Sequence, residues 1–265
     1  MAIGIMQGRL TPSRGRGVQF FPRDDAAWER EFSVAATIGL SHIEWVWDMP
    51  ENPLLDAGFR ARVRARIAET GVPVKGVDLQ FLTKTDFAEI SDATLKSICE
   101  AIADIHGAAI EPPLLEGSTL LDPKTQAARI AQLTRFCAFA KEYGLSIHLE
   151  TDLPAFEYGE LLATIPILSV VYDSGNSAHM GYSVNEEWNT YGSRIRNVQI
   201  KDRPLGGSTV VLGNGATDFK TLFKKMNEAG YSGLVTLQAA REEDGHEVET
   251  ISKYMKFVRS IYESI

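Results

Sequence analysis

Residues 123–150, PKTQAARIAQLTRFCAFAKEYGLSIHLE, contain the pattern that decides the fold. An amphipathic stretch of helical length, residues 123–143, is followed by Gly144 and then by the apolar run 146–150. A glycine directly after a helix adopts the left-handed conformation that closes the last turn. These residues therefore predict a helix, a tight turn and a buried strand in immediate succession.

The same pattern recurs along the chain, where short apolar, β-branched runs alternate with amphipathic stretches. The predicted strands are residues 3–7, 42–47, 74–79, 108–110, 146–150, 168–172, 195–200 and 234–238. The predicted helices are residues 25–38, 56–70, 91–106, 123–143, 155–163, 185–191, 218–229 and 246–264. Glycines that close a helix before a strand are predicted at Gly39, Gly71, Gly107, Gly144 and Gly230. Ser91 and Asp218 are predicted helix N-caps.

Strict alternation of strands and helices implies parallel strands that are joined by helical crossovers. The length of 265 residues is close to the roughly 250 residues of one (β/α)8 barrel. A doubly wound open sheet is the alternative, but no GxGxxG motif follows the first strand. Since no linker-like stretch divides the chain, the sequence predicts an α/β protein with one domain, residues 1–265, folded as a parallel (β/α)8 barrel.

Composition narrows the kinds of partner. With 27 basic and 35 acidic residues, the net charge is 27 − 35 = −8, which disfavours binding to nucleic acids. No apolar run is long enough to span a membrane, and the N-terminus lacks the pattern of a signal peptide. Cys99 and Cys137 lie in apolar helical patterns and are expected to be buried thiols in a reducing cytoplasm. We therefore expect a small-molecule partner and a cytoplasmic location.

Polar residues gather at the carboxyl ends of the predicted strands, where a barrel builds its site. Because side chains at i and i+2 share a face of a strand, His148 and Glu150 point together, as do Gln199, Lys201 and Arg203. Leu149 and Ile200 point the other way and form an apolar face that must meet the helices, so the polar set points into the barrel mouth. Burying so many polar groups costs several kcal/mol unless ligands, ions or water satisfy them. The sequence thus predicts a ligand site at this end.

Each of these residues also has a purely structural interpretation. A carboxylate at a strand end is more often the N-cap of the next helix, and Asp152 ahead of Pro154 is such a candidate. Glu150 and Asp173 lie inside otherwise apolar strands, and this context favours a functional role.

The neutral side chains are more ambiguous. Gln199 and Gln238 either serve the site or bond within the barrel interior, and His148 either orients a site residue or is a core histidine. Trp45 and Trp47 both lie in the predicted strand 42–47. We expect Trp45 to stack on a substrate and Trp47 to lie in the core.

Six segments together carry a resemblance that extends over the whole chain. They are GIMQGRL (4–10), IGLSHIEWVWD (38–48), HLETDL (148–153), YDSGNSA (172–178), NVQIKDR (197–203) and LGNGATDFKTLFKKMNEAGYSGLVTLQ (212–238). In this order they resemble the xylose isomerase-like TIM-barrel family. That family includes sugar-phosphate isomerases and epimerases as well as apurinic endonucleases.

The resemblance also implies a metal site. Family members hold a divalent metal ion with a Glu, an Asp, a His and a Glu, and these positions fall on Glu150, Asp173, Gln199 and Gln238. Two of the four residues therefore differ from the family pattern. The remaining all-oxygen set favours Mg²⁺ or Mn²⁺ over Zn²⁺, with an ion that is weakly held or absent.

The function that the resemblance implies is a sugar or sugar-phosphate isomerase or epimerase. Glu150 would abstract a proton next to a carbonyl, and a metal ion, or Lys201 with Arg203, would stabilise the enediolate. Lys201 is also the candidate second acid/base. The predicted substrate contacts are Gln7, Arg9, Glu44, Trp45, Asp78, Glu116, His148, Asn176, His179, Arg203 and Arg241.

Three alternatives remain beside this prediction. A dehydratase or lyase needs only one base, and Gln238 cannot take a proton, so this reaction is a close competitor. A non-catalytic sugar-binding relative would have lost both the metal ion and the base. A DNA-repair endonuclease is disfavoured by the five scattered histidines and the charge of −8. Pairing into a homodimer is expected from the habit of the family.

Overall fold

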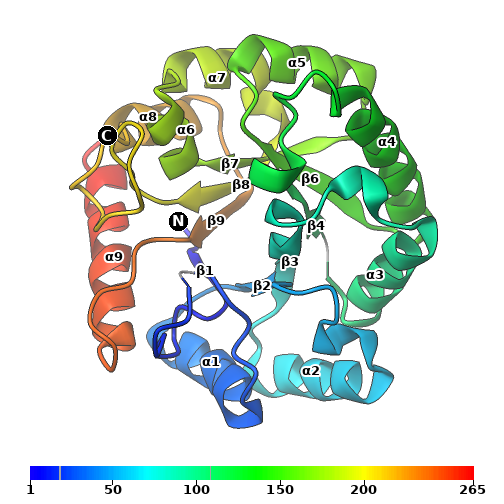
Figure 1. The fold of residues 1–265 in the computed structure, drawn as a ribbon. Helices are drawn as coiled ribbons and strands as arrows, with labels where there is room; N and C mark the ends of the chain where they lie inside the picture. The colour runs from blue at the N-terminus through cyan, green and yellow to red at the C-terminus, as the bar shows by residue number, and fades with distance from the viewer. Residues whose placement is uncertain (18, 108) are drawn as a thin grey trace.

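Parallel strands form a closed barrel at the centre of the molecule, inside a ring of helices (Figure 1). The computed structural model describes residues 1–17, 19–107 and 109–265. The strands are β1 (Gly4–Met6), β2 (Ile43–Val46), β3 (Val74–Asp78), β4 (Ala109–Glu111), β5 (Pro113–Leu114), β6 (Ser146–Thr151), β7 (Ser169–Asp173), β8 (Ile195–Ile200) and β9 (Leu234–Leu237). Their order in the described residues is β4-β3-β2-β1-β9-β8-β7-β6-β5, and a β4–β6 pairing closes the ring.

The short strands β4 and β5 occupy one position of the barrel. Pro112 separates them because it has no N–H to donate to a neighbouring strand, although its carbonyl accepts the N–H of Glu150 at 3.2 Å. Counted this way, the barrel has eight parallel strands, and the predicted (β/α)8 fold is confirmed. The predicted fourth strand began at Ala108, which lies outside the described residues, and the observed one continues to Leu114.

The α-helices are α1 (Asp25–Ile38), α2 (Ala57–Thr70), α3 (Asp92–Asp104), α4 (Gln126–Glu142), α5 (Ala155–Thr164), α6 (Ser174–Met180), α7 (Val184–Tyr191), α8 (Phe219–Glu228) and α9 (Glu247–Tyr262). Short 3-10 turns span Pro53–Leu55, Gln80–Thr83, Phe87–Glu89, Glu116–Ser118 and Gly192–Arg194. Helix α6 was not predicted, because its sequence SGNSAHM is small and polar and has no apolar period. No helix in the described ranges is long and apolar enough to cross a membrane.

The caps follow the sequence prediction with one exception. Positive φ angles occur at Gly39, Gly71, Gly144 and Gly230 as expected. After α3, however, the left-handed residue is His106 (φ 58°) rather than Gly107. Gly107 is needed for a different reason: a Cβ there would lie 2.7 Å from Cγ2 of Ile102.

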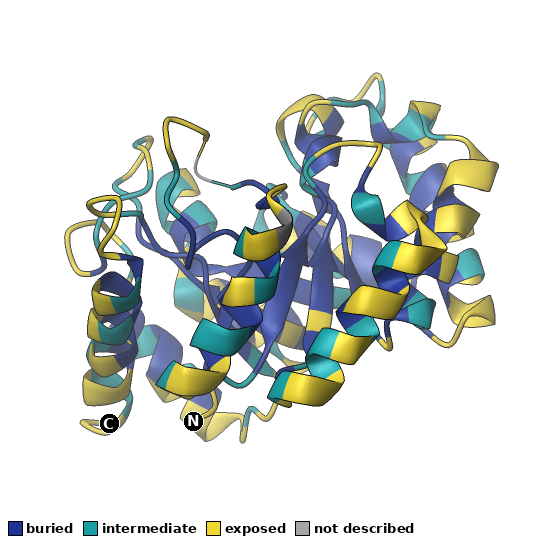
Figure 2. Ribbon diagram, turned by 90° about the horizontal axis from the view of Figure 1, so that it is seen from below, coloured by how far each residue is buried: buried dark blue, intermediate teal, exposed yellow. Residues whose placement is uncertain are grey.

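Trp45 lies in the apolar shell between the barrel and the helices. It is fully buried, and its ring centroid lies 5.1 Å from that of Phe21 and 6.2 Å from those of Trp28 and Phe59. Trp47 is also fully buried. The prediction that Trp45 stacks on a substrate therefore needs correction, since its ring faces α1 and α2. Figure 2 shows this shell, with buried strands inside helices whose outer faces are exposed. The buried thiols predicted at Cys99 and Cys137 are also observed, and both are unpaired.

A buried carboxylate on α1 fixes the loop after β1, and it predicts a pH-dependent stability. Glu31 accepts the N–H groups of Gly8 and Leu10 and the hydroxyl of Thr11. Burial raises its pKa from 4.5 to about 7. The folded state thus binds this proton more tightly than the unfolded state does. The resulting stabilisation of the fold is fully present below pH 4.5 and is lost as the pH rises through 7.

We therefore expect this group to cost the fold on the order of 3 kcal/mol between acidic and mildly alkaline pH. Urea unfolding of wild type and Glu31→Gln across this range measures the effect, and the variant should show a flatter pH dependence. Parallel curves for the two proteins would rule it out.

Candidate active site

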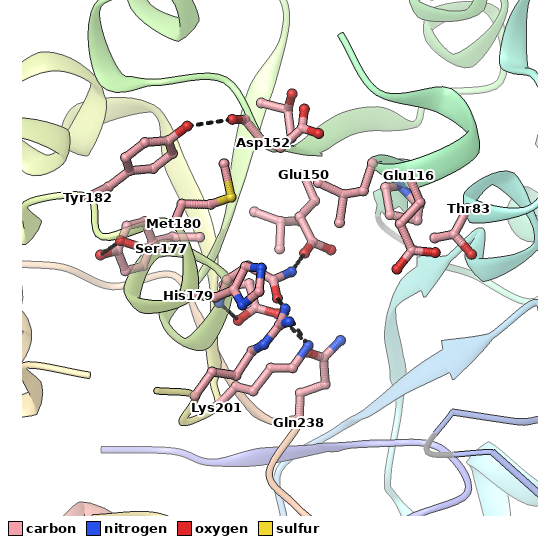
Figure 3. A pocket seen from close by; sticks show the side chains of 18 of the residues that line it. Thr83, Glu116, Glu150, Asp152, Ser177, His179, Met180, Tyr182, Lys201 and Gln238 are labelled. Carbon is pink, nitrogen blue, oxygen red and sulfur yellow. Dashed lines mark hydrogen bonds and ion pairs between the residues drawn. The ribbon is translucent and has the colours of Figure 1, made fainter. Parts of the chain in front are cut away.

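A cavity of about 230 Å³ opens at the carboxyl ends of β6, β7, β8 and β9 (Figure 3). In the close-up, Lys201 and Gln238 lie on one side of Glu150, and Glu116 and Thr83 lie on another. The structure brings together in this cavity eight of the residues singled out from the sequence: Glu116, Glu150, Asp173, Asn176, His179, Lys201, Arg203 and Gln238.

Asn176 connects three charged side chains of the cavity. Its Nδ2 donates to Oε1 of Glu150 at 2.5 Å, and its Oδ1 accepts from Nη1 of Arg203 at 2.7 Å and from Nζ of Lys201 at 3.4 Å. One amide thus links a carboxylate from β6 to two cations that follow β8. These contacts also fix the orientation of the amide, because only its nitrogen can face the carboxylate.

Asp173 ends β7 and begins α6. Its Oδ1 caps the helix by accepting the N–H groups of Gly175 and Asn176, and its Oδ2 accepts from Nζ of Lys201 at 3.0 Å. The turn from β7 to α6 therefore brings the Asp173 carboxylate and the Asn176 amide close to the ammonium group of Lys201.

Glu150 has the electrostatics of a base. The side chain is almost fully buried, and burial together with the nearby charge of Asp173 raises its pKa to about 8, while Lys201 acts in the opposite direction. A carboxylate with a pKa near neutrality accepts a proton more strongly than an ordinary glutamate does. Its environment therefore suits proton transfer.

Several predicted contacts lie deeper, in the barrel interior below the cavity. Asn197 Nδ2 donates to Oε2 of Glu44 at 2.8 Å, and Gln199 Nε2 donates to Oε1 of Glu44 at 2.5 Å. His148 Nδ1 lies 3.3 Å from Oε1 of Glu111. Burial lowers the pKa of His148 to about 4 and raises that of Glu111 to about 7, so this contact is a hydrogen bond of neutral histidine rather than an ion pair.

Gln7 and Asp78 also lie outside the residues that line the cavity. Gln7 Oε1 accepts the N–H of Val46, and Asp78 is buried, with a pKa held well above its usual range by burial and by Glu44. Like Glu44 and His148, these side chains are buried and do not line the cavity. Sequence parity placed them on the inner face but did not give their depth.

Arg9 and Arg241 lie outside the residues that line the cavity. Arg9 is buried and donates from Nε to the carbonyl of Ala239 at 3.0 Å, and Arg241 donates from Nη1 to the carbonyl of Thr11 at 2.9 Å. Both arginines thus tie the loop after β1 to the segment after β9. Their predicted substrate contact stays a prediction.

Residues from loops, a 3-10 turn and the end of α6 complete the cavity, and most of them were not predicted from the sequence. They are Gln19, Gln80, Thr83, Asp152, Met180 and Tyr182, among others. Asp152 is not the N-cap expected from its place ahead of Pro154, since α5 has no side-chain cap. Its Oδ2 accepts from Thr119 Oγ1 at 2.5 Å, and its carbonyl accepts from the Tyr182 hydroxyl. In the sequence, the signal for a site residue at this position was a polar side chain shortly before a proline.

The donor set does not fit a divalent metal ion well. Two of the four expected ligands are the neutral amides Gln199 and Gln238, and Gln199 is already held by Glu44. Among the described residues, no group of three or more His, Cys, Asp or Glu side chains is arranged to hold a metal ion. We therefore derive no chemical step through a metal ion.

The fold is thus a (β/α)8 barrel whose mouth holds a carboxylate, an amide and two cations. The family model described as "Xylose isomerase-like TIM barrel" matches residues 32–261, and the chain belongs to this family.

Three known proteins illustrate the relationship. Inosose dehydratase of Clostridium perfringens is 23% identical over 198 residues, which cover 65% of this chain and 66% of the relative, just under two thirds of its length. D-allulose 3-epimerase from Methylomonas sp., solved with D-allulose, superimposes with a TM-score of 0.75 at 16% identity, covering 99% of this chain and 97% of that one. The IOLI protein, solved with a zinc atom, gives 0.73 at 16% identity and covers 100% of both chains. At this identity the two solved structures establish the fold alone.

Proposed function

We propose that this chain abstracts a proton from the carbon next to a carbonyl in a sugar-like polyol, with Glu150 as the base. The observation that carries the proposal is the contact of Glu150 with Asn176, whose other end holds Lys201 and Arg203. A buried base beside two cations suits a reaction in which negative charge moves from the substrate carbon onto its oxygen.

For an aldose–ketose isomerisation, Glu150 takes the proton from the carbon beside the carbonyl, and the electron pair moves onto the carbonyl oxygen. Lys201 and Arg203 stabilise this enediolate through their positive charges. The proton then returns from Glu150 to the neighbouring carbon, while a hydroxyl proton moves between the two oxygens. Atoms and charge balance without any co-reactant.

The position of Gln238 favours this one-base course over a symmetric epimerisation. An epimerase needs a second base on the opposite face of the substrate, and an amide cannot take a proton. The orphaned Oε1 of Gln238, which has no hydrogen-bond partner among the described residues, is suited to accept a substrate hydroxyl.

Dehydration is a second candidate. The inosose dehydratase relatives favour it, together with the missing second carboxylate. Here Glu150 takes the same proton, and the β-hydroxyl leaves with that proton as water. The two reactions therefore share the base and the enediolate and differ in the fate of the proton.

A deuterium experiment tests the proposal. Purified protein is incubated in D₂O with a panel of ketoses, their phosphates and inosose, and NMR follows exchange at the carbon next to the carbonyl. Isomerisation yields an isomer, deuterated to the extent that the proton on Glu150 exchanges with solvent before it returns, while dehydration yields an unsaturated product and water. Absence of both exchange and product in the whole panel, with a polyol still bound, would favour a non-catalytic sugar-binding protein.

The pH dependence of turnover follows from the state of the base. Because Glu150 must be ionised to accept a proton and its pKa is about 8, we expect kcat/KM to rise with pH and level off near that value. In Lys201→Met this limb should move to higher pH, since the ammonium lowers the pKa of Glu150. A profile that is flat from mildly acidic to alkaline pH would place the base elsewhere.

A further inference from the structure

The two carboxylates at the metal-ligand positions of the family pattern, Glu150 and Asp173, already have donors from the chain itself. Oε1 of Glu150 accepts from the Asn176 amide, and both oxygens of Asp173 are engaged, one by two backbone N–H groups and one by Lys201 Nζ. At Asp173, a metal ion would have to compete with these donors for both oxygens. The ammonium lies against the carboxylate oxygen that faces it, at 3.0 Å.

The fold also provides room for the stem of this lysine. Gly175, in the first turn of α6, lies so close that a Cβ there would be 2.7 Å from Cγ and 2.9 Å from Cβ of Lys201. The side chain of Lys201 is 11% exposed and that of Asp173 is 1% exposed. The ammonium is therefore a packed, nearly buried part of the site rather than a surface cation that happens to reach it.

The other two family ligand positions have become neutral. The Oε1 atoms of Gln199 and Gln238 are buried and have no hydrogen-bond partner among the described residues. A carbonyl dipole attracts a divalent ion far less than a full negative charge does, but it is a good acceptor for a hydroxyl group. The loss of negative charge at these two positions and the packed Lys201 ammonium thus both weaken the binding of a divalent cation.

We propose that the Lys201 ammonium is the resident cation of this site and stands in place of a divalent metal ion. The positive charge of Lys201, held against Asp173, repels an incoming cation. It is also already in place to bind a substrate oxygen. This inference deepens the proposed function by naming the cation, and it rests on that function only for what the cation does to the substrate. The family pattern of acidic ligands and a metal ion is then replaced by two amides and a lysine.

Metal binding tests the proposal independently of turnover. Chelator-treated protein is titrated with Mn²⁺ alone, by calorimetry and by electron paramagnetic resonance of free Mn²⁺. Four proteins are compared: wild type, Lys201→Met, the double variant Gln199→His/Gln238→Glu, and the triple variant that combines all three changes. Lys220→Met, at an exposed position of α8, is the matched control for loss of a lysine charge.

We expect wild type and the control to bind no Mn²⁺ below about 1 mM, and the triple variant to bind at least about 100-fold more tightly than the double variant. Lys201→Met alone should bind more tightly than Lys220→Met, which keeps the test valid if the triple variant does not fold. Stoichiometric Mn²⁺ in wild type at micromolar concentration would overturn the proposal, as would equal affinities with and without Lys201. Failure of the proposed function would instead appear as absence of both deuterium exchange and product while these affinities keep their expected order.

Discussion

Glu150→Gln is expected to lower kcat by about 10²–10⁴-fold, the range that a general base contributes. The amide keeps the shape of the side chain, and its Oε1 still accepts from Nδ2 of Asn176. Only the ability to take a proton is lost. Turnover and deuterium exchange are measured on the substrate that the ketose panel identifies, with circular dichroism and thermal unfolding to show that the fold is intact.

Two controls separate basicity from charge. Glu116→Gln removes a carboxylate that lines the same cavity, and Glu160→Gln removes one from the exposed face of α5. Both variants should keep kcat within a few-fold of wild type, because neither carboxylate contacts Asn176 in any described hydrogen bond. Since Glu116 is a predicted substrate contact, its loss is expected to appear in KM. If Glu116→Gln were as inactive as Glu150→Gln, the base would have to be reassigned.

The inner face of the barrel could be predicted because strand periodicity is a local property. An alternation of polar and apolar residues in IHLE and VQIKDR is sufficient to tell which side chains point inward. Residues at the carboxyl ends of these strands are then expected to meet in one site, because parallel strands end at the same edge of the sheet. Thus Glu150, Asp173 and Lys201 could be placed in one cavity from the sequence.

Depth along the barrel axis could not be predicted in the same way. His148 and Glu150 share a face of β6, yet His148 lies beside Glu111 and Glu150, two residues further along, lines the cavity. Which of these two levels opens to the cavity depends on the stagger between neighbouring strands, which leaves no trace in a single sequence. Arginines raise a similar problem, because their length lets Arg9 reach a backbone carbonyl far along the chain.

Outward-facing aromatic residues give the clearest case of this limit. Trp45 and Trp47 lie two positions apart in one segment, so parity places them on the same face but does not say which partner each meets. The structure gives Trp45 three aromatic neighbours from two helical segments and the loop after β1. Its energetic role is thus packing, and this assignment has a large measurable consequence.

Trp45→Ala is expected to destabilise the fold by about 3–5 kcal/mol, the usual cost of removing a fully buried large aromatic side chain. For a chain of this size the loss corresponds to a fall in Tm of about 10 °C. The ring packs on the outer side of β2, so its removal would leave an empty space directly against the barrel wall. Thermal and urea unfolding measure the effect, with KM determined on the fraction that remains folded.

Phe156→Ala is the matched control, because this aromatic side chain on α5 is 70% exposed and should contribute within about 0.5 kcal/mol. The comparison distinguishes the two roles that the sequence left open for Trp45. A packing residue lowers stability and leaves KM nearly unchanged at a temperature where the variant is folded. A stacking residue does the reverse, raising KM while the unfolding curve stays close to that of wild type. Since the indole ring contacts Phe21, Trp28 and Phe59 on the far side of β2 from the cavity, a raised KM with unchanged stability would contradict the orientation of this strand itself.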